Sequence, residues 1–443
     1  MRSVLLALIP LFASLALISG GSSYLITLIG IQLGAQGVQP MHVGYVMSCY
    51  SLGFVLGTIF TPKLLLKVGH IRAFAALASM TGITVISYPI SEDIFFWALL
   101  RGVGGFFIAG LYIVIESWLS ATTTPKNRST VFAFYLLSSY SASASAQQFI
   151  GHGVSLGVYI AFTIGAIMIF ASSVPLSITS RQSPSLDEST SMSPFRLAKR
   201  AILGLVGALA GGFMLGTFYG LVPLYSTMTG LDSYEIGNLM SLSITLAMVC
   251  AWPIGWLADR VPRSMVMLGL IVISGAAALM AMLFGRQVAS LLFVCVPVIM
   301  ACSASIYSIS VAITQDLVEN EERISASSTL LMAYGVGSII GPMIGSWTMQ
   351  NIGPSALFAC FISVLTALGL FTLYRQSRQA PLPVELQEQF KPIIPEVQVN
   401  GELLPFDEVE ATTERDGETS MPYEQGVDER SEPPVDSAES AKR

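Results

Sequence analysis

The ionisable side chains within apolar segments are the residues of this sequence best suited to chemistry. Glu116 lies in such a segment, where an unpaired charge costs several kcal/mol, so it is a candidate proton carrier. A gating salt bridge with Lys126 or Arg128 is the alternative. Arg101 precedes Glu116 by 15 residues, about 22 Å along a helix, and helical spacing puts Tyr112 on the same face. We expect this face to avoid lipid, with Arg101 holding an anionic substrate, balancing a proton site or anchoring the helix at the outer membrane surface.

Uncharged polar side chains in other apolar segments are candidates for lining a substrate path through the membrane. Tyr307 belongs to a stripe of polar residues at helical spacing, and Gln147 and Gln148 follow a run rich in Ser and Ala. We interpret these three as cavity residues. For the serine run itself and for the glycines we expect close helix packing. Pro223 interrupts a glycine-rich apolar segment, which is typical of bending helices.

No cluster of residues indicates enzymatic chemistry or a bound cofactor. The three histidines have no metal-ligand spacing, and no G-x-x-x-x-G-K-[ST] nucleotide-binding motif occurs. All five cysteines fall in apolar runs, which predicts packed thiols. The sequence therefore predicts a protein that is not an enzyme, holds no metal or cofactor and binds no nucleic acid.

The composition predicts a membrane protein. Of 443 residues, 53% are hydrophobic and 11% are charged, against roughly a quarter charged in soluble domains. A single soluble core stops growing near roughly 250–300 residues, so the bilayer must solvate most of this chain. We expect an all-α protein with about twelve spanning helices of about 20 residues. The segments are 4–29, 43–66, 72–90, 95–119, 129–150, 154–179, 201–227, 236–258, 264–284, 288–315, 324–349 and 354–374.

The distribution of Lys and Arg predicts the orientation. With the N-terminus inside, fifteen of them fall on the cytoplasmic side and only Arg286 on the other. Both termini are then cytoplasmic in a bacterial inner membrane.

An internal repeat divides the chain. Residues 43–48 (Val-Gly-Tyr-Val-Met-Ser) recur 193 positions later as 236–241 (Ile-Gly-Asn-Leu-Met-Ser). We therefore predict two six-helix bundles, residues 1–180 and 201–379, joined by a cytoplasmic linker at 181–200. Parallel repeats of this kind place a substrate site between the halves. Residues 380–443 carry 5 Lys+Arg against 16 Asp+Glu and are predicted to form a disordered tail.

The loop at residues 255–263 (Gly-Trp-Leu-Ala-Asp-Arg-Val-Pro-Arg) resembles a signature of the major facilitator superfamily. Arg101-x-x-Gly104-Gly105 looks like a second signature of that family. The chain around Glu116 is most similar to the bacterial YcaD-type members. The resemblance implies a cytoplasmic latch at Gly255, Asp259, Arg260 and Arg263, with acidic residues of the 316–322 loop as partners. It also implies a helix-bending or packing motif at Gly337, Gly341, Pro342 and Gly345.

The sequence departs from the family pattern at three places, of which the first is Gly104, where the second signature usually has glutamine. In the first half the loop signature is degenerate, with Pro62, Leu66 and His70 replacing the usual residues. In the fifth segment, residues 138–145 are Ser, Tyr and Ala where antiporters carry glycine and proline. Drug/proton antiport therefore does not follow from that motif.

The function expected from these features is secondary transport. We predict a monomer that moves a small organic solute, such as a metabolite or drug-like compound, by alternating access, with protons as the coupling ion. Import and efflux remain alternatives. A membrane sensor that signals through the acidic tail is the alternative from another class, and tail truncation separates the two.

Overall fold

The computed structural model describes residues 2–178, 194–319 and 322–378, together with Pro383, Gln387 and Phe390. The described residues form helices and no strand. Of the predicted linker at 181–200, residues 181–193 lie outside them and residues 194–200 belong to α9; nearly all of the predicted tail also lies outside them. The elements are α1 (Arg2–Ala35), α2 (Pro40–Val68), α3 (His70–Ser87), η1 (Tyr88–Ile90), α4 (Ile94–Thr122), α5 (Pro125–Gln147), α6 (Ile150–Ser155), α7 (Val158–Ala171), α8 (Ser173–Ser177), α9 (Pro194–Met228), α10 (Ser233–Ala258), α11 (Arg263–Phe284), α12 (Ala289–Gln315), α13 (Arg323–Ile352) and α14 (Ala356–Arg378).

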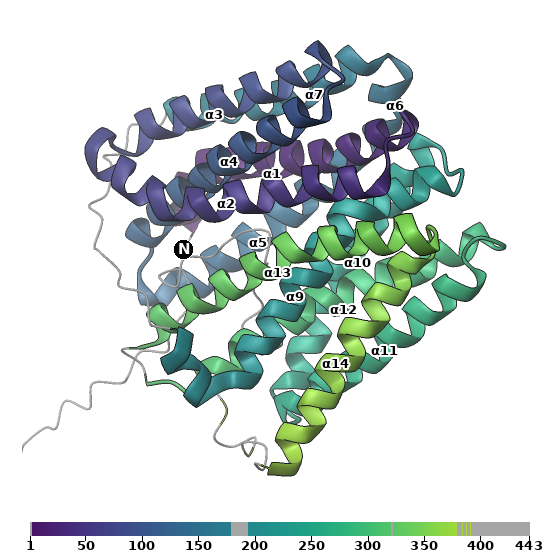
Figure 1. The fold of residues 1–443 in the computed structure, drawn as a ribbon. Helices are drawn as coiled ribbons and strands as arrows, with labels where there is room; N and C mark the ends of the chain where they lie inside the picture. Colours follow the sequence, from purple (N-terminus) through teal and green to yellow (C-terminus); the bar gives the residue numbers. More distant parts are fainter. Residues whose placement is uncertain are drawn as a thin grey trace, which may run out of the picture. The chain divides into compact units, whose positions relative to one another are not determined.

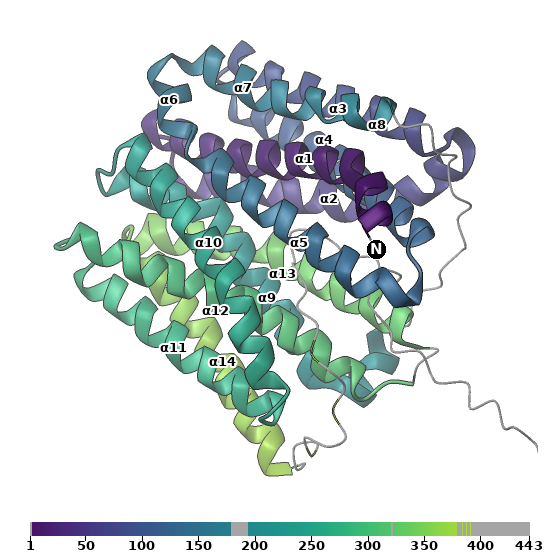
Figure 2. The ribbon, with the colours of Figure 1, turned by 180° about the vertical axis from the view of Figure 1, so that it is seen from behind.

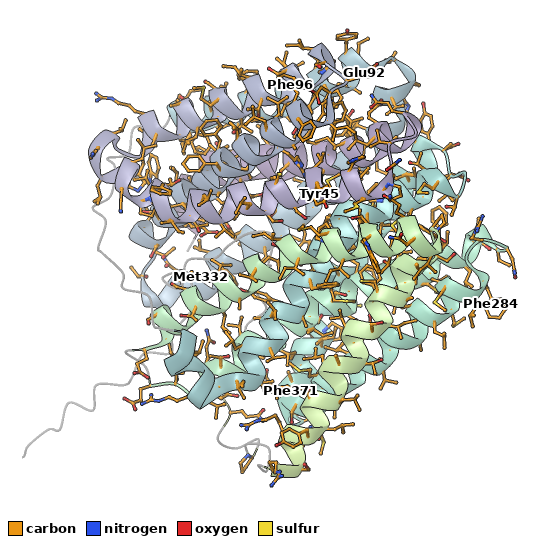
Figure 3. The ribbon with its side chains drawn as sticks, viewed as in Figure 1. Tyr45, Glu92, Phe96, Phe284, Met332 and Phe371 are labelled. Carbon is orange, nitrogen blue, oxygen red and sulfur yellow. The ribbon has the colours of Figure 1, made fainter. Side chains whose placement is uncertain are left out.

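The apolar helices confirm the predicted all-α membrane fold. Eleven spans in the described part of the chain are long and apolar enough to cross a bilayer, with α7 and α8 together forming one of them. The segment predicted at 129–150 is occupied by α5 and α6 and is not among the eleven, because its serines lower its hydropathy. Bulky apolar side chains also cover the outside, as Phe284 (49% exposed) illustrates in Figure 3. An apolar exterior of this kind suits lipid rather than water.

Local sequence fixes several helix ends. The Asp93 carboxylate accepts a hydrogen bond from the Phe95 amide at 2.8 Å and so caps α4. Asp232 and Glu235 form a reciprocal capping box at the start of α10. Gly69 alone separates α2 from α3, with φ of 80°, a conformation that glycine adopts without strain.

Two groups of helices are visible in Figures 1 and 2. In the first group, α1–α8, α2 packs on α4, α1 on α5 and α7, and α3 on α4 and α7. In the second group, α9–α14, α9 packs on α12 and α13, α10 on α12, and α11 on α12 and α14. The groups meet through α1 with α9, α2 with α13 and α5 with α10. If the two halves of the repeat are exchanged, α2 takes the place of α10 and α13 takes the place of α5. The contact of α2 with α13 then becomes the contact of α10 with α5, as internal symmetry requires.

Glycines bring two helix pairs into close contact. Between α2 and α4, a methyl group on Gly53 would lie 1.8 Å from the Gly102 backbone oxygen. Between α13 and α9, methyl groups on Gly337 and Gly341 would lie 2.1 Å and 2.4 Å from the backbone oxygens of Leu209 and Phe213. Because glycine has no side chain, the backbones of these helices come into contact, as in other small-residue membrane interfaces.

Gly345 and Pro342 extend the α13 motif. A methyl group on Gly345 would lie 2.9 Å from the side chains of Thr217 and Leu221, so this glycine also packs against α9. Pro342 lies inside α13 without ending it, and its ring faces Gly220 of α9. In this structure the Gly-Pro motif thus lies in the contact between α9 and α13.

Candidate functional site

A cavity lies between the two groups of helices, near the middle of their length. It encloses about 880 Å³, solvent at its mouth included. The first group contributes residues of α1, α2, α4 and α5, and the second group contributes residues of α9 and α13. Most of the polar lining is hydroxyl-bearing, namely Ser19, Ser22, Ser23, Ser51, Ser139, Ser143, Ser338, Tyr50, Tyr112, Tyr219 and Tyr334.

Hydroxyl groups of the first group are joined in a network, here called the polar wall. Ser139 of α5 donates to the Ser19 hydroxyl of α1 at 2.8 Å, and Ser143 donates to the Ser19 backbone oxygen at 3.2 Å. The Ser19 hydroxyl is also 3.3 Å from the Tyr112 hydroxyl of α4. The predicted cavity residue Tyr112 thus lines the cavity. The serine run, for which we expected close helix packing, packs on α1, and two of its members, Ser139 and Ser143, also line the cavity.

The part of the lining that comes from α9 and α13 carries two tyrosines. They are Tyr219 of α9 and Tyr334 of α13, and Gly216, Gly220 and Gly335 belong to the same part. We call these five residues the aromatic wall. Predicted cavity residue Tyr307 does not line the cavity but packs behind Tyr334, with ring centroids 5.0 Å apart and planes at 62°.

Arg101 lies behind the cavity lining. Its guanidinium carbon is 4.2 Å from the centre of the Tyr50 ring, and its Nη2 is 4.0 Å from the Met47 sulfur. Both partners line the cavity, whereas Arg101 is only 3% exposed and does not. Arg101 therefore supports the cavity lining through Tyr50 and Met47 and does not line the cavity itself.

Glu116 is buried between α4 and α5. It is 1% exposed, and its Oε1 accepts a hydrogen bond from the Tyr135 hydroxyl at 2.7 Å. It belongs to α4 about one turn beyond the cavity residue Tyr112. The next residue, Ser117, is 2.9 Å from the His70 ring nitrogen Nε2. The side chains of Lys126 and Arg128, its predicted ion-pair partners, lie outside the described part of the chain.

The two predicted glutamines point in different directions. Gln147 is fully buried and donates from Nε2 to the Ser23 backbone oxygen at 2.9 Å and to the Ser23 hydroxyl at 2.7 Å. It thus holds the cavity residue Ser23 in place. Gln148, at the end of α5, is exposed and does not line the cavity.

Several contacts that join the two groups lie to one side of the cavity. Ser48 of α2 donates to the Ile339 backbone oxygen of α13 at 2.7 Å. A methyl group on Gly30 of α1 would lie 2.9 Å from Pro223 of α9, which places this proline in the interface. Gly237 of α10 packs on the backbone of α5. The two glycine contacts belong to the ends of α1, α5 and α9 and to the start of α10, and Gly44 near the start of α2 packs on Ser346 in the last third of α13. The cavity is therefore closed by helix contacts at that end.

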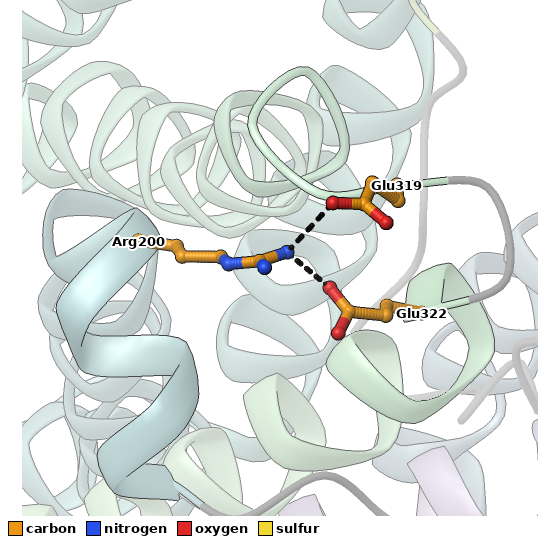
Figure 4. A network of polar contacts seen from close by, with 3 residues as sticks. All are labelled: Arg200, Glu319 and Glu322. Carbon is orange, nitrogen blue, oxygen red and sulfur yellow. Dashed lines mark hydrogen bonds and ion pairs between the residues drawn. The ribbon is translucent and has the colours of Figure 1, made fainter.

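At the opposite end lies the signature loop between α10 and α11. Arg263 is buried, and its Nη1 contacts Asp316 at 2.5 Å and the Ala312 backbone oxygen at 2.8 Å. Arg260 is exposed and stacks on Trp256 at 4.0 Å. The acidic loop after α12 thus pairs with Arg263. Two further acids of that loop, Glu319 and Glu322, contact Arg200 of α9 instead (Figure 4).

A residue beyond α14 binds the same loop. The Phe390 amide donates to the Asp259 carboxylate at 2.6 Å. The Phe390 ring is buried and packs where a methyl group on Gly255 would lie, 2.7 Å away. Two residues of the predicted latch, Gly255 and Asp259, therefore contact Phe390.

Some cavity residues were not predicted from the sequence. Tyr50, Tyr334 and Ser338 line the cavity. The available signal was spacing, because Tyr334 and Ser338 are four residues apart and so share a helix face.

Comparison with known proteins identifies the family. The sequence matches the model described as Major Facilitator Superfamily over residues 11–301 and 229–406. An uncharacterized MFS-type transporter of Enterobacter sp. (strain 638), Ent638_1421, is 30% identical over 379 residues, which cover 84% of this chain and 97% of that protein. The uncharacterized MFS-type transporter YcaD of Salmonella enteritidis PT4 is 29% identical over 380 residues, with the same coverage of both chains.

Solved structures share the fold. A bacterial homolog of the human lysosomal transporter Spinster, crystallised inward-facing and occupied, aligns with a TM-score of 0.67 and 14% identity over 88% of this chain and 99% of that one. The nucleoside transporter NupG aligns with a TM-score of 0.66 and 16% identity over 84% and 99%. The chain, with its apolar helices and central cavity, therefore belongs to the Major Facilitator Superfamily and is a multi-pass membrane transporter.

Proposed function

We propose that the protein is a secondary transporter that binds a small organic solute in the cavity and moves it by alternating access. The observation that carries this proposal is the place of the cavity between the two groups, with several joining contacts to one side of it. Separating those contacts and closing the other side would expose the cavity to the opposite compartment. The protein acts in this proposal as a monomer.

The charge distribution supports an orientation. The end of the bundle that carries the signature loop and the start of α1 is rich in Lys and Arg, so we assign it to the cytoplasm of a bacterial inner membrane. The contacts that close the cavity are then at the outer end, and the structure represents an inward-facing state.

Protons are the proposed coupling ion, with Glu116 as the carrier. Its carboxylate is buried near the cavity and has a hydroxyl donor, Tyr135, on the neighbouring helix. A carboxyl group can take up and release a proton in such a place, while glutamine, of almost the same shape, cannot. Tyr135→Phe removes only the hydrogen bond.

We expect Glu116→Gln to abolish solute-dependent proton flux. Inside-out vesicles containing the full chain would be energised, and an internal pH dye would be followed while amino acids, sugars, organic acids and cationic drugs are added. In the wild type one of these compounds collapses the pH gradient, and in the variant none does. Tyr135→Phe is expected to weaken the response without removing it.

Glu92→Gln is the matched control. Glu92 is exposed in the segment before α4, so this variant should respond like the wild type. An undiminished response in the Glu116→Gln vesicles would show that Glu116 is not the carrier. A panel that moves no protons in the wild type would count against proton antiport of these compounds.

One observation favours a second candidate function, a sensor. Phe390 binds the signature loop through Asp259 and Gly255, and in alternating access this loop would move. A chain ending after residue 378 separates the two. For a transporter we expect flux to persist in this truncated chain, whereas a sensor should lose its signalling output.

A further inference from the structure

The lining of the cavity is uncharged. Seven serines and four tyrosines contribute its hydroxyl groups, and the described residues that line it include no Asp, Glu, Lys, Arg or His. Hydroxyl groups both donate and accept hydrogen bonds, so this lining suits hydroxyl, carbonyl and amide groups of either kind. A carboxylate or an ammonium would find no opposite charge on it.

Nearby ionisable groups are held away from the cavity. Tyr50 stands between the cavity and the Arg101 guanidinium, which stacks on the Tyr50 ring. Glu116 is 1% exposed and engaged by Tyr135 of α5. Bringing a charged solute into this apolar surrounding would leave its charge unpaired, which is costly in a site of low dielectric constant.

The two walls of the cavity differ in kind. In the polar wall, the hydroxyls of Ser19, Ser139 and Tyr112 lie within hydrogen-bond distance of one another. In the aromatic wall, Tyr219 and Tyr334 contribute two aromatic rings, while Gly216, Gly220 and Gly335 pack closely on Ser338, Met47 and Val55. A ligand that matches both walls has a ring face on one side and hydrogen-bonding groups on the other.

We infer that the cavity selects an uncharged, ring-bearing solute, with its polar groups toward the polar wall and its ring toward the aromatic wall. The inference rests on the proposed function in taking the cavity as the substrate site. The inference is tested by binding measurements, so the inference and the proposed function can fail separately. Binding without transport contradicts the proposed function. Transport without this selectivity contradicts the inference.

Two matched series of probes vary only the charge. The first is indole-3-acetamide, indole-3-acetate and tryptamine. The second is phenyl β-D-glucoside, the corresponding glucuronide and the 6-amino-6-deoxy glucoside. Calorimetric titration of the purified full chain in detergent would give each affinity. We expect the neutral member of at least one series to bind, and its anionic and cationic partners to bind at least about tenfold more weakly.

Variants assign the binding to the cavity. Ser139→Ala is expected to lower the affinity for the neutral probe about fivefold, because one hydrogen bond is lost. Tyr334→Leu is expected to lower it through loss of the ring contact. Ser363→Ala, which removes an exposed hydroxyl of α14, is the control and should leave binding unchanged. Ser22→Asp places a carboxylate in the cavity from a half-buried position and should reverse the preference toward the cationic member.

Each outcome decides for or against the inference. Selective binding of a neutral probe, weakened by the cavity variants and reversed by Ser22→Asp, supports it. Binding of a charged member as tight as that of its neutral partner overturns it, and so does failure of both neutral probes to bind. If Ser22→Asp is not monodisperse, Ser51→Asp offers the same test from α2.

Discussion

Gly53→Ala is expected to prevent stable assembly of the first group of helices. The added methyl group would lie 1.8 Å from the Gly102 backbone oxygen and 2.7 Å from its carbonyl carbon. Neither atom can move without shifting α4 as a whole, so the cost should reach or exceed the upper end of the about 1–3 kcal/mol typical of overpacking. Size-exclusion chromatography and thermal unfolding in detergent would show little monodisperse protein and a lowered Tm.

Gly275→Ala is the control for this prediction. Gly275 lies inside α11, and a methyl group there meets no atom within 4 Å. Because alanine favours helix more than glycine does, this variant should be as stable as the wild type or slightly more stable. Equal stability of the two alanine variants would contradict the close contact of α2 with α4.

Asp316→Ala is expected to lower stability by about 3–5 kcal/mol, the usual cost of leaving one member of a buried ion pair alone. Arg263 and Asp316 are 3% and 4% exposed and lie 2.5 Å apart, at the start of α11 and just after α12. The change would leave the guanidinium charge buried between these helices. Loss of unfolding free energy in denaturant titration is the measurement.

Two further variants make this test specific. Glu319→Ala removes a neighbouring acid whose contact with Arg200 is exposed, and exposed pairs contribute about 0–1 kcal/mol. The double variant Arg263→Met with Asp316→Leu removes both charges and should regain much of the lost stability. If Asp316→Ala is no more damaging than Glu319→Ala, the pair does not hold the loop.

The sequence predicted the helices well because hydrophobic length alone requires them. Its weakest segment was 129–150, where serines interrupt the apolar run; the structure places a helix there and explains the serines, since Ser139 and Ser143 bond to α1. The family resemblance was also confirmed. It could be recognised from the sequence because the signature loop at 255–263 consists of residues adjacent in the chain.

Helix rotation could not be predicted as reliably. Gln147 and Gln148 are neighbours, yet one is buried against Ser23 and the other is exposed. In a bilayer both faces of a helix are apolar, so hydrophobic periodicity gives little guidance on which face looks inward. Tyr50 and Tyr334 were missed for this reason. The contact of Phe390 with Asp259 joins residues 131 apart, and no local pattern indicates it.

The single glycine between α2 and α3 has a mechanical consequence. A connection of one residue cannot lengthen, so when α2 tilts the start of α3 must move with the end of α2. Spectroscopic labels on these two helices should therefore keep a constant separation during a transport cycle. The separation between labels on α2 and α13, which meet across the two groups, should change during the cycle.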